Sequence, residues 1–183
     1  MTMAEGDEVN EVSLVSYAIP EKANSVEFKQ ISMIAKQLLD HLNQPNKIKE
    51  LLIANQPGNS SAMVQDVFIG YAEELGFESE KKGLFKEYSM GMRPDYYMKT
   101  KSSGIIIEVE RGKTTINNMD MLDFWKTHLC NHANHLFLFV PKELRQNETM
   151  KPKKEFNNVK KRLEKFFLPG NETNVHTLHL FGY

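Results

Sequence analysis

The stretch that decides the fold is Gly91–Thr114, which reads GMRPDYYMKTKSSGIIIEVERGKT. Two apolar runs separated by the polar turn Lys99–Gly104 predict a β-hairpin. The second strand, Ile105–Glu110, begins with three isoleucines, which is typical of a central strand covered on both faces. Two glutamates end the same strand, so charged groups are expected where the strand leaves the core.

Strand parity places the two glutamates on one face of the sheet. Because side chains alternate, Glu108 and Glu110 lie on the side of Ile106, with their Cα atoms about 7 Å apart. The hairpin partner brings Asp95 alongside them. Three converging carboxylates without a cation between them suit a hard divalent ion with oxygen ligands, Mg²⁺ or Mn²⁺. The alternative is a hairpin whose charged end runs out into solvent.

This pattern resembles a known metal-binding motif. A Pro-Asp pair that ends at Asp95, followed after twelve residues by Glu108-x-Glu110, resembles the motif of the PD-(D/E)xK nuclease superfamily, which has the restriction-endonuclease-like fold. The resemblance covers roughly residues 60–140 and implies that Asp95 and Glu108 hold the metal. The third position, usually lysine, orients the attacking water, and here it is Glu110. Either Glu110 or Lys113 is expected to take that role.

Two residues on neighbouring helices are expected to support the site. In the superfamily, the helix before the hairpin often carries an acidic residue that faces the metal, and Gln65 stands in that place. The helix after the catalytic strand can lend a polar residue, for which Lys126 is the candidate. For both residues, an ordinary surface side chain is the alternative.

The distribution of charge is more informative than the net charge of −1, which argues against bulk affinity for nucleic acid. Residues 142–165 include nine bases and four acids, a basic flank that suits a phosphodiester substrate. A solvated helix face is the alternative interpretation. The residues expected to meet phosphates are Arg93, Arg111, Lys151, Lys153, Lys154, Lys160 and Lys161.

The rest of the chain predicts helices and strands around the hairpin. The apolar run at 136–140 is expected to form a strand parallel to the one bearing Glu108, after a right-handed crossover. The helix between them, predicted at 116–128, is expected to carry Met119, Leu122, Trp125 and Leu129 on one face, with Asp120, Asp123 and Lys126 elsewhere around it. Other helices are predicted near 28–43, 48–54, 61–75 and 156–167, and other strands near 84–89 and 175–181.

These elements predict a single α/β domain with a mixed central β-sheet flanked by helices. Residues 28–183 are expected to form it, after a weakly ordered acidic segment, 1–27, in which 13–19 could add an edge strand. No segment approaches the roughly 18 consecutive apolar residues of a membrane span. Because the single cysteine, Cys130, cannot form an internal disulfide, the protein is expected to be cytoplasmic.

A cluster of histidines and the cysteine follows the predicted helix. His128, Cys130, His132 and His135 are side chains that zinc prefers. Their spacing matches no common structural zinc pattern, so an ordinary helix-to-strand turn is the preferred interpretation.

The leading hypothesis is a metal-dependent endonuclease that hydrolyses DNA phosphodiester bonds with Mg²⁺ or Mn²⁺ as cofactor; an RNA target is not excluded. A homodimer would fit, since cutting both strands of a duplex commonly uses two copies of one site. The competing hypothesis is a non-catalytic nucleic-acid-binding or assembly subunit with a degenerate nuclease fold. Glu110 in place of lysine favours this second hypothesis slightly.

Overall fold

The computed structural model describes residues 11–79, 93–112, 114–145, 149 and 151–183. The strands are β1 (Ser13–Ala18), β2 (Glu78–Ser79), β3 (Tyr96–Lys99), β4 (Gly104–Val109), β5 (His135–Val140) and β6 (Thr177–Gly182). The helices are α1 (Val26–Leu42), α2 (Pro45–Ala54), α3 (Ser61–Glu74), α4 (Met119–Leu129) and α5 (Glu155–Leu163), followed by a 3₁₀ turn at Glu164–Phe167.

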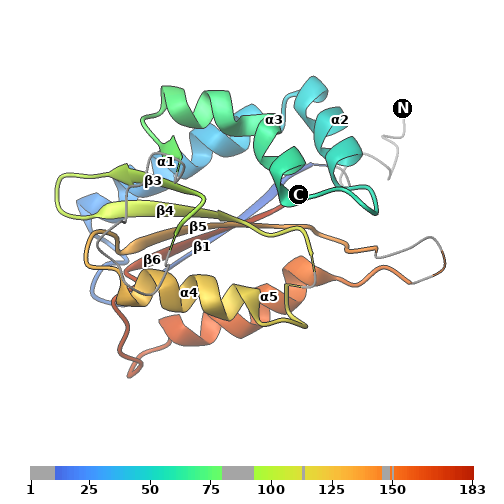
Figure 1. Cartoon of the computed structure of the whole chain (residues 1–183). Helices are drawn as coiled ribbons and strands as arrows, with labels where there is room; N and C mark the ends of the chain where they lie inside the picture. Colours follow the sequence, from blue (N-terminus) through green and yellow to red (C-terminus); the bar gives the residue numbers. More distant parts are fainter. Residues whose placement is uncertain (1–10, 80–92, 113, 146–148, 150) are drawn as a thin grey trace, which may run out of the picture.

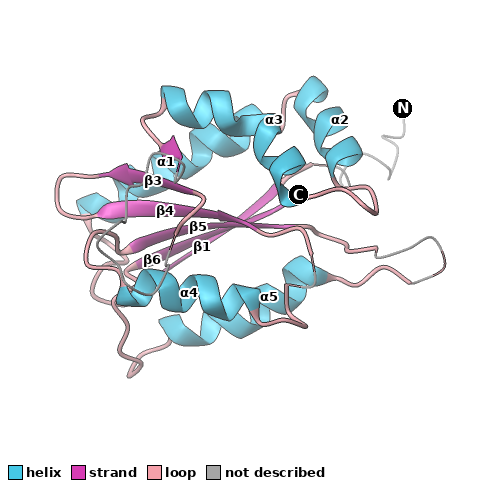
Figure 2. Cartoon of the chain, viewed as in Figure 1, coloured by secondary structure: helices cyan, strands magenta, loops and turns pink. Residues whose placement is uncertain are grey.

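One mixed sheet lies between two layers of helices (Figure 1). Its strand order is β1-β6-β5-β4-β3-β2. Strands β4, β5 and β6 are parallel, while β1, β2 and β3 pair antiparallel with their neighbours. Figure 2 shows α1, α2 and α3 above the sheet and α4 and α5 below it. The predicted α/β class, the single domain and the parallel pairing of the 136–140 strand are confirmed.

Strand β4 is the centre of the core. Ile105, Ile106 and Ile107 are each at most 1% exposed, as expected for a strand covered on both faces. Ile105 and Ile107 pack in the core beneath α1, α2 and α3, whereas Ile106 packs in the core that faces α4 and α5. The alternation of faces along β4 is therefore the predicted one, and it points Glu108 toward α4.

The N-terminal part of the described chain belongs to the sheet. Strand β1 pairs with β6 along its whole length, from Ser13 opposite Gly182 to Ala18 opposite Thr177. The edge strand predicted within 1–27 is thus present, and residues 1–10 lie outside the described residues. The strand expected near 84–89 also lies outside them.

Helix α4 does not pack on the sheet with its apolar stripe. Leu122, Trp125 and Leu129 are 54%, 46% and 49% exposed, whereas Asp123 and Thr127 are at most 1% exposed. The buried face combines these polar residues with the apolar Phe124. This face turns inward because the sheet presents the Glu108 carboxylate to the helix, and Lys126 and Asp123 meet it there.

Among the described residues, no helix combines the length and the apolar character needed to cross a membrane.

Gly104, at the start of β4, is expected to be intolerant of a side chain. A Cβ at this position would lie 2.6 Å from the backbone oxygen of His132 and would also collide with the Tyr97 ring. Gly104→Ala should therefore lower the free energy of unfolding by about 2 kcal/mol, as overpacking does. Urea denaturation measures the change, and wild-type stability of this variant would contradict the packing described.

Gly70→Ala provides the matched control. Gly70 lies inside α3, and nothing lies within 4 Å of the added Cβ. Because alanine is the better helix former, this variant should gain up to about 1 kcal/mol.

Candidate functional site

Three acidic side chains meet where β4 leaves the sheet. Tyr96 pairs with Ile107 across the β3–β4 hairpin, so the preceding residue, Asp95, lies next to Glu108. Asp95 Oδ2 accepts a hydrogen bond of 2.8 Å from the backbone N–H of Val109. This bond fixes the aspartate against the strand that carries both glutamates. The hairpin therefore gathers Asp95, Glu108 and Glu110 at one end of β4.

Helix α4 adds a fourth acid and a cation to this group. Lys126 Nζ lies 2.7 Å from Glu108 Oε1 and 3.2 Å from Asp123 Oδ1. Glu108 is 4% exposed and Asp123 is 1% exposed, so the ion pairs are largely shielded from water. Asp123 was not among the predicted site residues. Its signal in the sequence is the polar series Asp120, Asp123 and Thr127, which has the spacing of one helix face.

Burial and mutual repulsion raise the pKa values of these acids. The pKa of Glu110 is raised to about 8, first by burial and then by the negative charges of Asp123 and Asp95. Burial raises the pKa of Asp123 to about 6 and that of Glu108 well above its usual value. Burial alone would lower the pKa of Lys126, but Glu108 and Asp123 outweigh it and raise that pKa. At neutral pH, Glu110 therefore retains a proton beside a charged lysine.

The donor chemistry of the acid cluster (Asp95, Glu108, Glu110 and Asp123) fits a hard divalent cation. All its ligand atoms are carboxylate oxygens, the kind that Mg²⁺ and Mn²⁺ prefer. Asp123 Oδ1 is paired with Lys126, and the protonated Glu110 interacts with the same carboxylate. The raised pKa values reflect more negative charge than Lys126 neutralises.

The spacing of these oxygens is wider than one ion requires. Within the described part of the chain, the only three ligand-bearing side chains gathered within 4.8 Å of one another are Glu27, His135 and His176. The Lys126 ammonium group lies between Glu108 and Asp123, 2.7 Å and 3.2 Å from their carboxylate oxygens, and so keeps the two carboxylates apart. A metal ion in the acid cluster would therefore require rotation of at least one glutamate side chain.

Gln65 lies away from the acid cluster. Gln65, on α3, accepts a hydrogen bond of 2.9 Å from Tyr96 Oη, and Tyr96 belongs to the core on the α1–α3 side of the sheet. The structure thus places Gln65 across the sheet from α4. Arg93 is exposed two residues before Asp95. Lys113 lies outside the described residues.

The Arg111 side chain forms hydrogen bonds within the protein. Its guanidinium donates to the carbonyl oxygens of Asn59 at 2.6 Å and Asn55 at 3.2 Å, and also to that of Gln56. These bonds fasten the loop between α2 and α3 to the segment that follows β4. The guanidinium is therefore engaged by carbonyl groups, although it was predicted to meet phosphates.

The lysines predicted to bind nucleic acid cluster around α5. Lys151, Lys154 and Lys161 are exposed, and Lys153 and Lys160 are partly buried. Helix α5 turns Phe156, Val159 and Leu163 to the core, so its basic side chains are on the outside.

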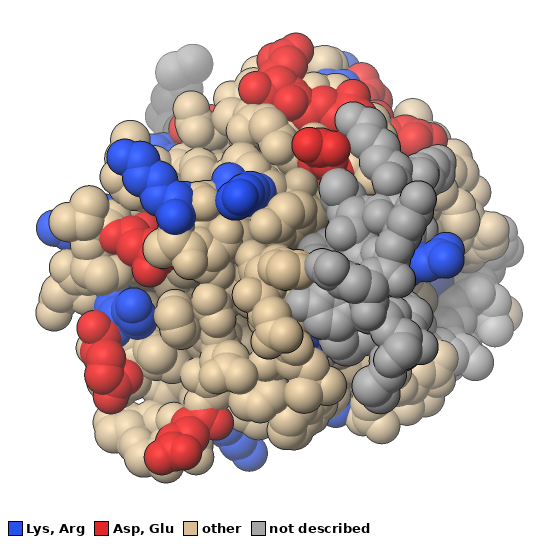
Figure 3. Space-filling view, turned by 60° about the vertical axis from the view of Figure 1, so that its left-hand side comes forward, with Lys and Arg blue, Asp and Glu red and all other residues tan. Residues whose placement is uncertain are grey.

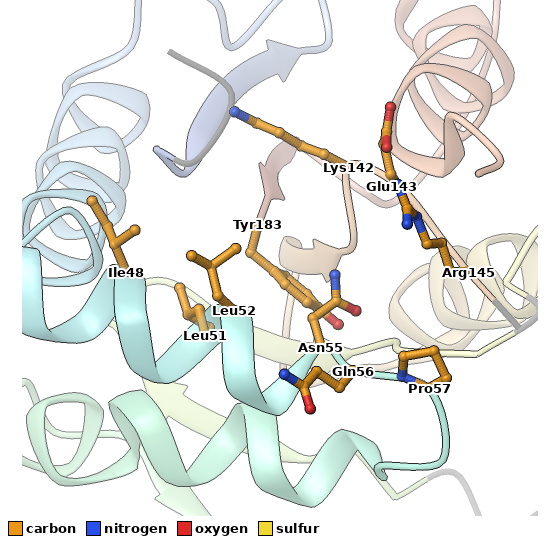
Figure 4. Close-up of a pocket in the computed structure, with 10 residues that line it drawn as sticks. All are labelled: Ile48, Leu51, Leu52, Asn55, Gln56, Pro57, Lys142, Glu143, Arg145 and Tyr183. Atoms are coloured by element: carbon orange, nitrogen blue, oxygen red, sulfur yellow. The ribbon is translucent and has the colours of Figure 1, made fainter. Parts of the chain in front are cut away.

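A cavity of about 450 Å³ opens beside the end of the sheet that carries the acid cluster (Figure 4). Figure 4 shows Leu51 and Leu52 of α2 beside the Tyr183 ring, with Lys142 and Arg145 coming from the segment after β5. Tyr183 Oη donates a hydrogen bond of 2.7 Å to the carbonyl oxygen of Glu110. The cavity therefore abuts the segment through which the chain leaves the acid cluster.

The opposite end of the sheet carries charges of both signs. Figure 3 turns forward the side that lies at the left of Figure 1, where the β3–β4 turn is found. Acidic side chains gather at the top of this view, and lysines and arginines are scattered among uncharged residues. Among the described residues visible there, no continuous basic surface forms.

Comparison with known proteins yields no family model, curated protein or solved structure that matches this chain. The functional argument therefore rests on the geometry of the acid cluster.

Glu110→Gln is expected to stabilise the protein more at pH 8.5 than at pH 4.5. The folded protein holds the Glu110 proton up to about pH 8, whereas the unfolded chain releases it near the usual value of 4.5. Because the folded state binds more protons between these values, the free energy of unfolding falls as pH rises through that window. Glutamine cannot ionise, so the variant avoids this loss. Thermal unfolding at both pH values measures the difference.

Glu172→Gln is the control, because Glu172 is exposed in the loop before β6. It should change the unfolding temperature little at either pH. An equal gain for Glu110→Gln at both pH values would contradict the raised pKa of Glu110.

Proposed function

We propose that this protein is a metal-dependent endonuclease that hydrolyses DNA phosphodiester bonds. One observation carries the proposal: Lys126 Nζ lies 2.7 Å from Glu108, within a buried group of acids at the end of a β-hairpin. The superfamily motif requires two metal-holding acids and a cation. Here Asp95 and Glu108 supply the acids and α4 supplies the cation that position 110 lacks.

The order of elements supports the proposal. Helix α3 ends at Glu74 and is followed by Gly76, whose φ of +101° suits glycine, and by Phe77, which enters the core. The hairpin β3–β4 comes next, then α4 and the parallel strand β5. A helix ending in Gly-Phe, an acid-bearing hairpin, a helix and a strand is the order that the resemblance to restriction-endonuclease-like proteins implies.

The side chains have distinct roles in this proposal. Asp95 and Glu108 would hold Mg²⁺ or Mn²⁺, with Glu110 as the third acid. When bound, the ion would polarise a phosphate oxygen and lower the pKa of a bound water. Lys126 orients Glu108 and places a positive charge where the phosphate gains negative charge. The pKa of Glu110 is about 8 in the metal-free cluster, and a bound cation would lower it, so that Glu110 could accept a proton from the attacking water near neutral pH.

Basic residues near this end of the sheet would position the substrate. Lys142 and Arg145 line the cavity, and the exposed lysines of the α5 region lie farther along the chain. Contacts of this kind bind the sugar–phosphate backbone without reading sequence. They suit an enzyme whose chemistry is confined to the acid cluster.

Asp95→Asn and Glu108→Gln are expected to abolish Mg²⁺-dependent cleavage of supercoiled plasmid. Each variant removes a negative ligand but keeps the side-chain shape, so the circular dichroism spectrum should be unchanged. The assay compares plasmid, linear duplex, single strands and RNA with Mg²⁺, Mn²⁺ or chelator. Asp40→Asn is the control, because Asp40 is exposed and pairs with Lys36 on α1. Wild-type cleavage rates in both cluster variants would refute the proposal.

A non-catalytic nucleic-acid-binding or assembly subunit is the second candidate. Three observations favour it. Lys126 already neutralises part of the acid cluster, and the oxygens are not gathered as ligands of one ion. In addition, Leu122, Trp125 and Leu129 form an exposed apolar face on α4, which suits contact with another protein, including a second copy of this chain.

Titration with Mn²⁺ by calorimetry separates the two candidates. For the nuclease, wild-type protein should bind Mn²⁺ and Asp95→Asn should bind it at least tenfold more weakly, because a charged ligand is lost. For the second candidate, Asp95→Asn should leave any Mn²⁺ binding unchanged, while a gel-shift assay still detects bound DNA. Glu172→Gln, which alters an exposed acid, controls for the loss of one negative charge.

A further inference from the structure

A second group of ligand-bearing side chains lies on the other face of the sheet. Glu27 is in the first turn of α1, His135 begins β5, and His176 directly precedes β6. One ligand atom from each lies within 4.8 Å of the others. His135 pairs with Ile105, three residues along β4 from Glu108, which corresponds to about 10 Å. The group is therefore separate from the acid cluster in both position and face.

The ring of His135 is fixed by burial and by a hydrogen bond to one of its nitrogens, as is common for histidines that bind metals. Its side chain is 1% exposed, and its Nδ1 lies 2.9 Å from Thr177 Oγ1. When Nδ1–H donates to this hydroxyl, Nε2 carries a free lone pair. Nε2 is buried without a hydrogen-bond partner among the described residues, and Glu27 Oε1 is 3.4 Å away. Histidines that bind metals commonly have their second ring nitrogen fixed in this way.

His176 brings a second imidazole to the same place. Its backbone N–H donates to Asn134 at 2.7 Å, and its carbonyl oxygen accepts from Ile19 at 3.0 Å, so its position is fixed on both sides. Its Nδ1 is also buried without a hydrogen-bond partner in the described part of the chain. Burial lowers the pKa of His176, and it lowers that of His135 to about 4. Both rings are therefore neutral at pH 7, as metal binding requires.

Glu27 supplies the negative charge. Its Oε1 accepts a hydrogen bond from Ser102 Oγ in the β3–β4 turn, and Lys22 Nζ is 3.9 Å from Oε2. Burial opposes ionisation, but Ser102 and His135 outweigh it and lower the pKa of Glu27. The carboxylate therefore carries a negative charge beside two buried imidazole nitrogens, His135 Nε2 at 3.4 Å and His176 Nδ1, which receives no hydrogen bond from the described residues.

We propose that Glu27, His135 and His176 bind one Zn²⁺ ion. Two imidazole nitrogens and one carboxylate oxygen are a zinc ligand set, whereas Mg²⁺ prefers oxygen ligands alone. Three protein ligands leave the fourth tetrahedral position for water or a small anion. The proposal concerns residues outside the acid cluster and does not depend on nuclease activity.

Zinc at this position would join segments that are far apart in the chain. It would tie the start of α1 to the starts of β5 and β6, and through Ser102 to the β3–β4 turn. Because the unfolded chain lacks this arrangement, zinc would bind the folded protein and stabilise it by an amount that rises with the logarithm of the free ion concentration above the Kd.

The test uses the full chain, freed of metal with a chelator and dialysed. The titrations use the Asp95→Asn background, in which the acid cluster has lost a charged ligand. Calorimetric titration with Zn²⁺ should show one site per chain there, and thermal unfolding should shift upward with added Zn²⁺ but not with the same concentration of Mg²⁺. Glu27→Gln and His176→Gln should each weaken Zn²⁺ binding at least tenfold and reduce the thermal shift, because each removes one ligand. Visible absorption of bound Co²⁺ provides a second readout of the same ligands.

Two control variants locate the site. His132→Gln alters an exposed histidine of the turn before β5, and Asp95→Asn alters the acid cluster. Both should retain the single Zn²⁺ site. If His176→Gln fails to fold by circular dichroism, Glu27→Gln decides, because Glu27 is 22% exposed at the start of a helix. Absence of Zn²⁺ binding by wild type, or unchanged binding in Glu27→Gln, would overturn the proposal and leave a direct contact between Glu27 and His135.

Discussion

A negative charge buried at the end of the central strand is the constraint on which the lower half of the molecule depends. Glu108 is 4% exposed and follows three isoleucines that have almost no contact with water. An isolated carboxylate in such a place would cost several kcal/mol, so a cation has to reach it. Lys126 does so at 2.7 Å, and this pairing fixes the rotation of α4 about its own axis. Leu122, Trp125 and Leu129 of α4 are left on the surface, while Phe124 packs in the core, because the same helix cannot present both faces to the sheet.

The polar interior continues beyond this ion pair. Asp120, which has no exposed surface, lies 3.2 Å from Arg162 Nε, and the buried Glu155 accepts hydrogen bonds from the backbone N–H and hydroxyl of Thr115. These contacts join α4, α5 and the segment between β4 and α4. They connect the elements that surround the acid cluster, and such supporting contacts are what a functional site requires. On the other face of the sheet, α1, α2 and α3 pack chiefly through apolar side chains.

The sequence was sufficient where local pattern determines structure, and insufficient where a distant partner does. The hairpin, the central position of β4 and the parallel strand β5 follow from the isoleucine run, the polar turn and the continuous apolar segment Leu136–Val140. Placement of Asp95 beside Glu108 follows from hairpin pairing.

The orientation of α4 does not follow from local pattern. The hydropathy of the helix favours burial of Leu122 and Trp125, and only the presence of Glu108 on the facing strand reverses that preference. Asp123 was overlooked for the same reason. Glu27 and His176 come from remote parts of the chain, and their approach to His135 depends on the register of β5 with β6 and on where α1 begins.

One sheet therefore presents two kinds of ligand chemistry at its two ends. The acid cluster offers only oxygen atoms, and a lysine already occupies part of its space. A metal ion there would compete with Lys126, so the cluster favours an ion that binds oxygen and exchanges readily. The group around His135 offers nitrogen as well as oxygen. The ammonium group beside it, on Lys22, lies 3.9 Å from Glu27 and outside the set of ligands. Two imidazole nitrogens and one carboxylate oxygen bind a metal of intermediate softness, such as Zn²⁺, more tightly than a hard metal such as Mg²⁺. A firmly bound ion that ties α1 to β5 and β6 would serve the architecture, and an exchangeable one held by Asp95 and Glu108 would serve the chemistry. Because the two groups face opposite sides of the sheet, each can be altered without changing the ligands of the other.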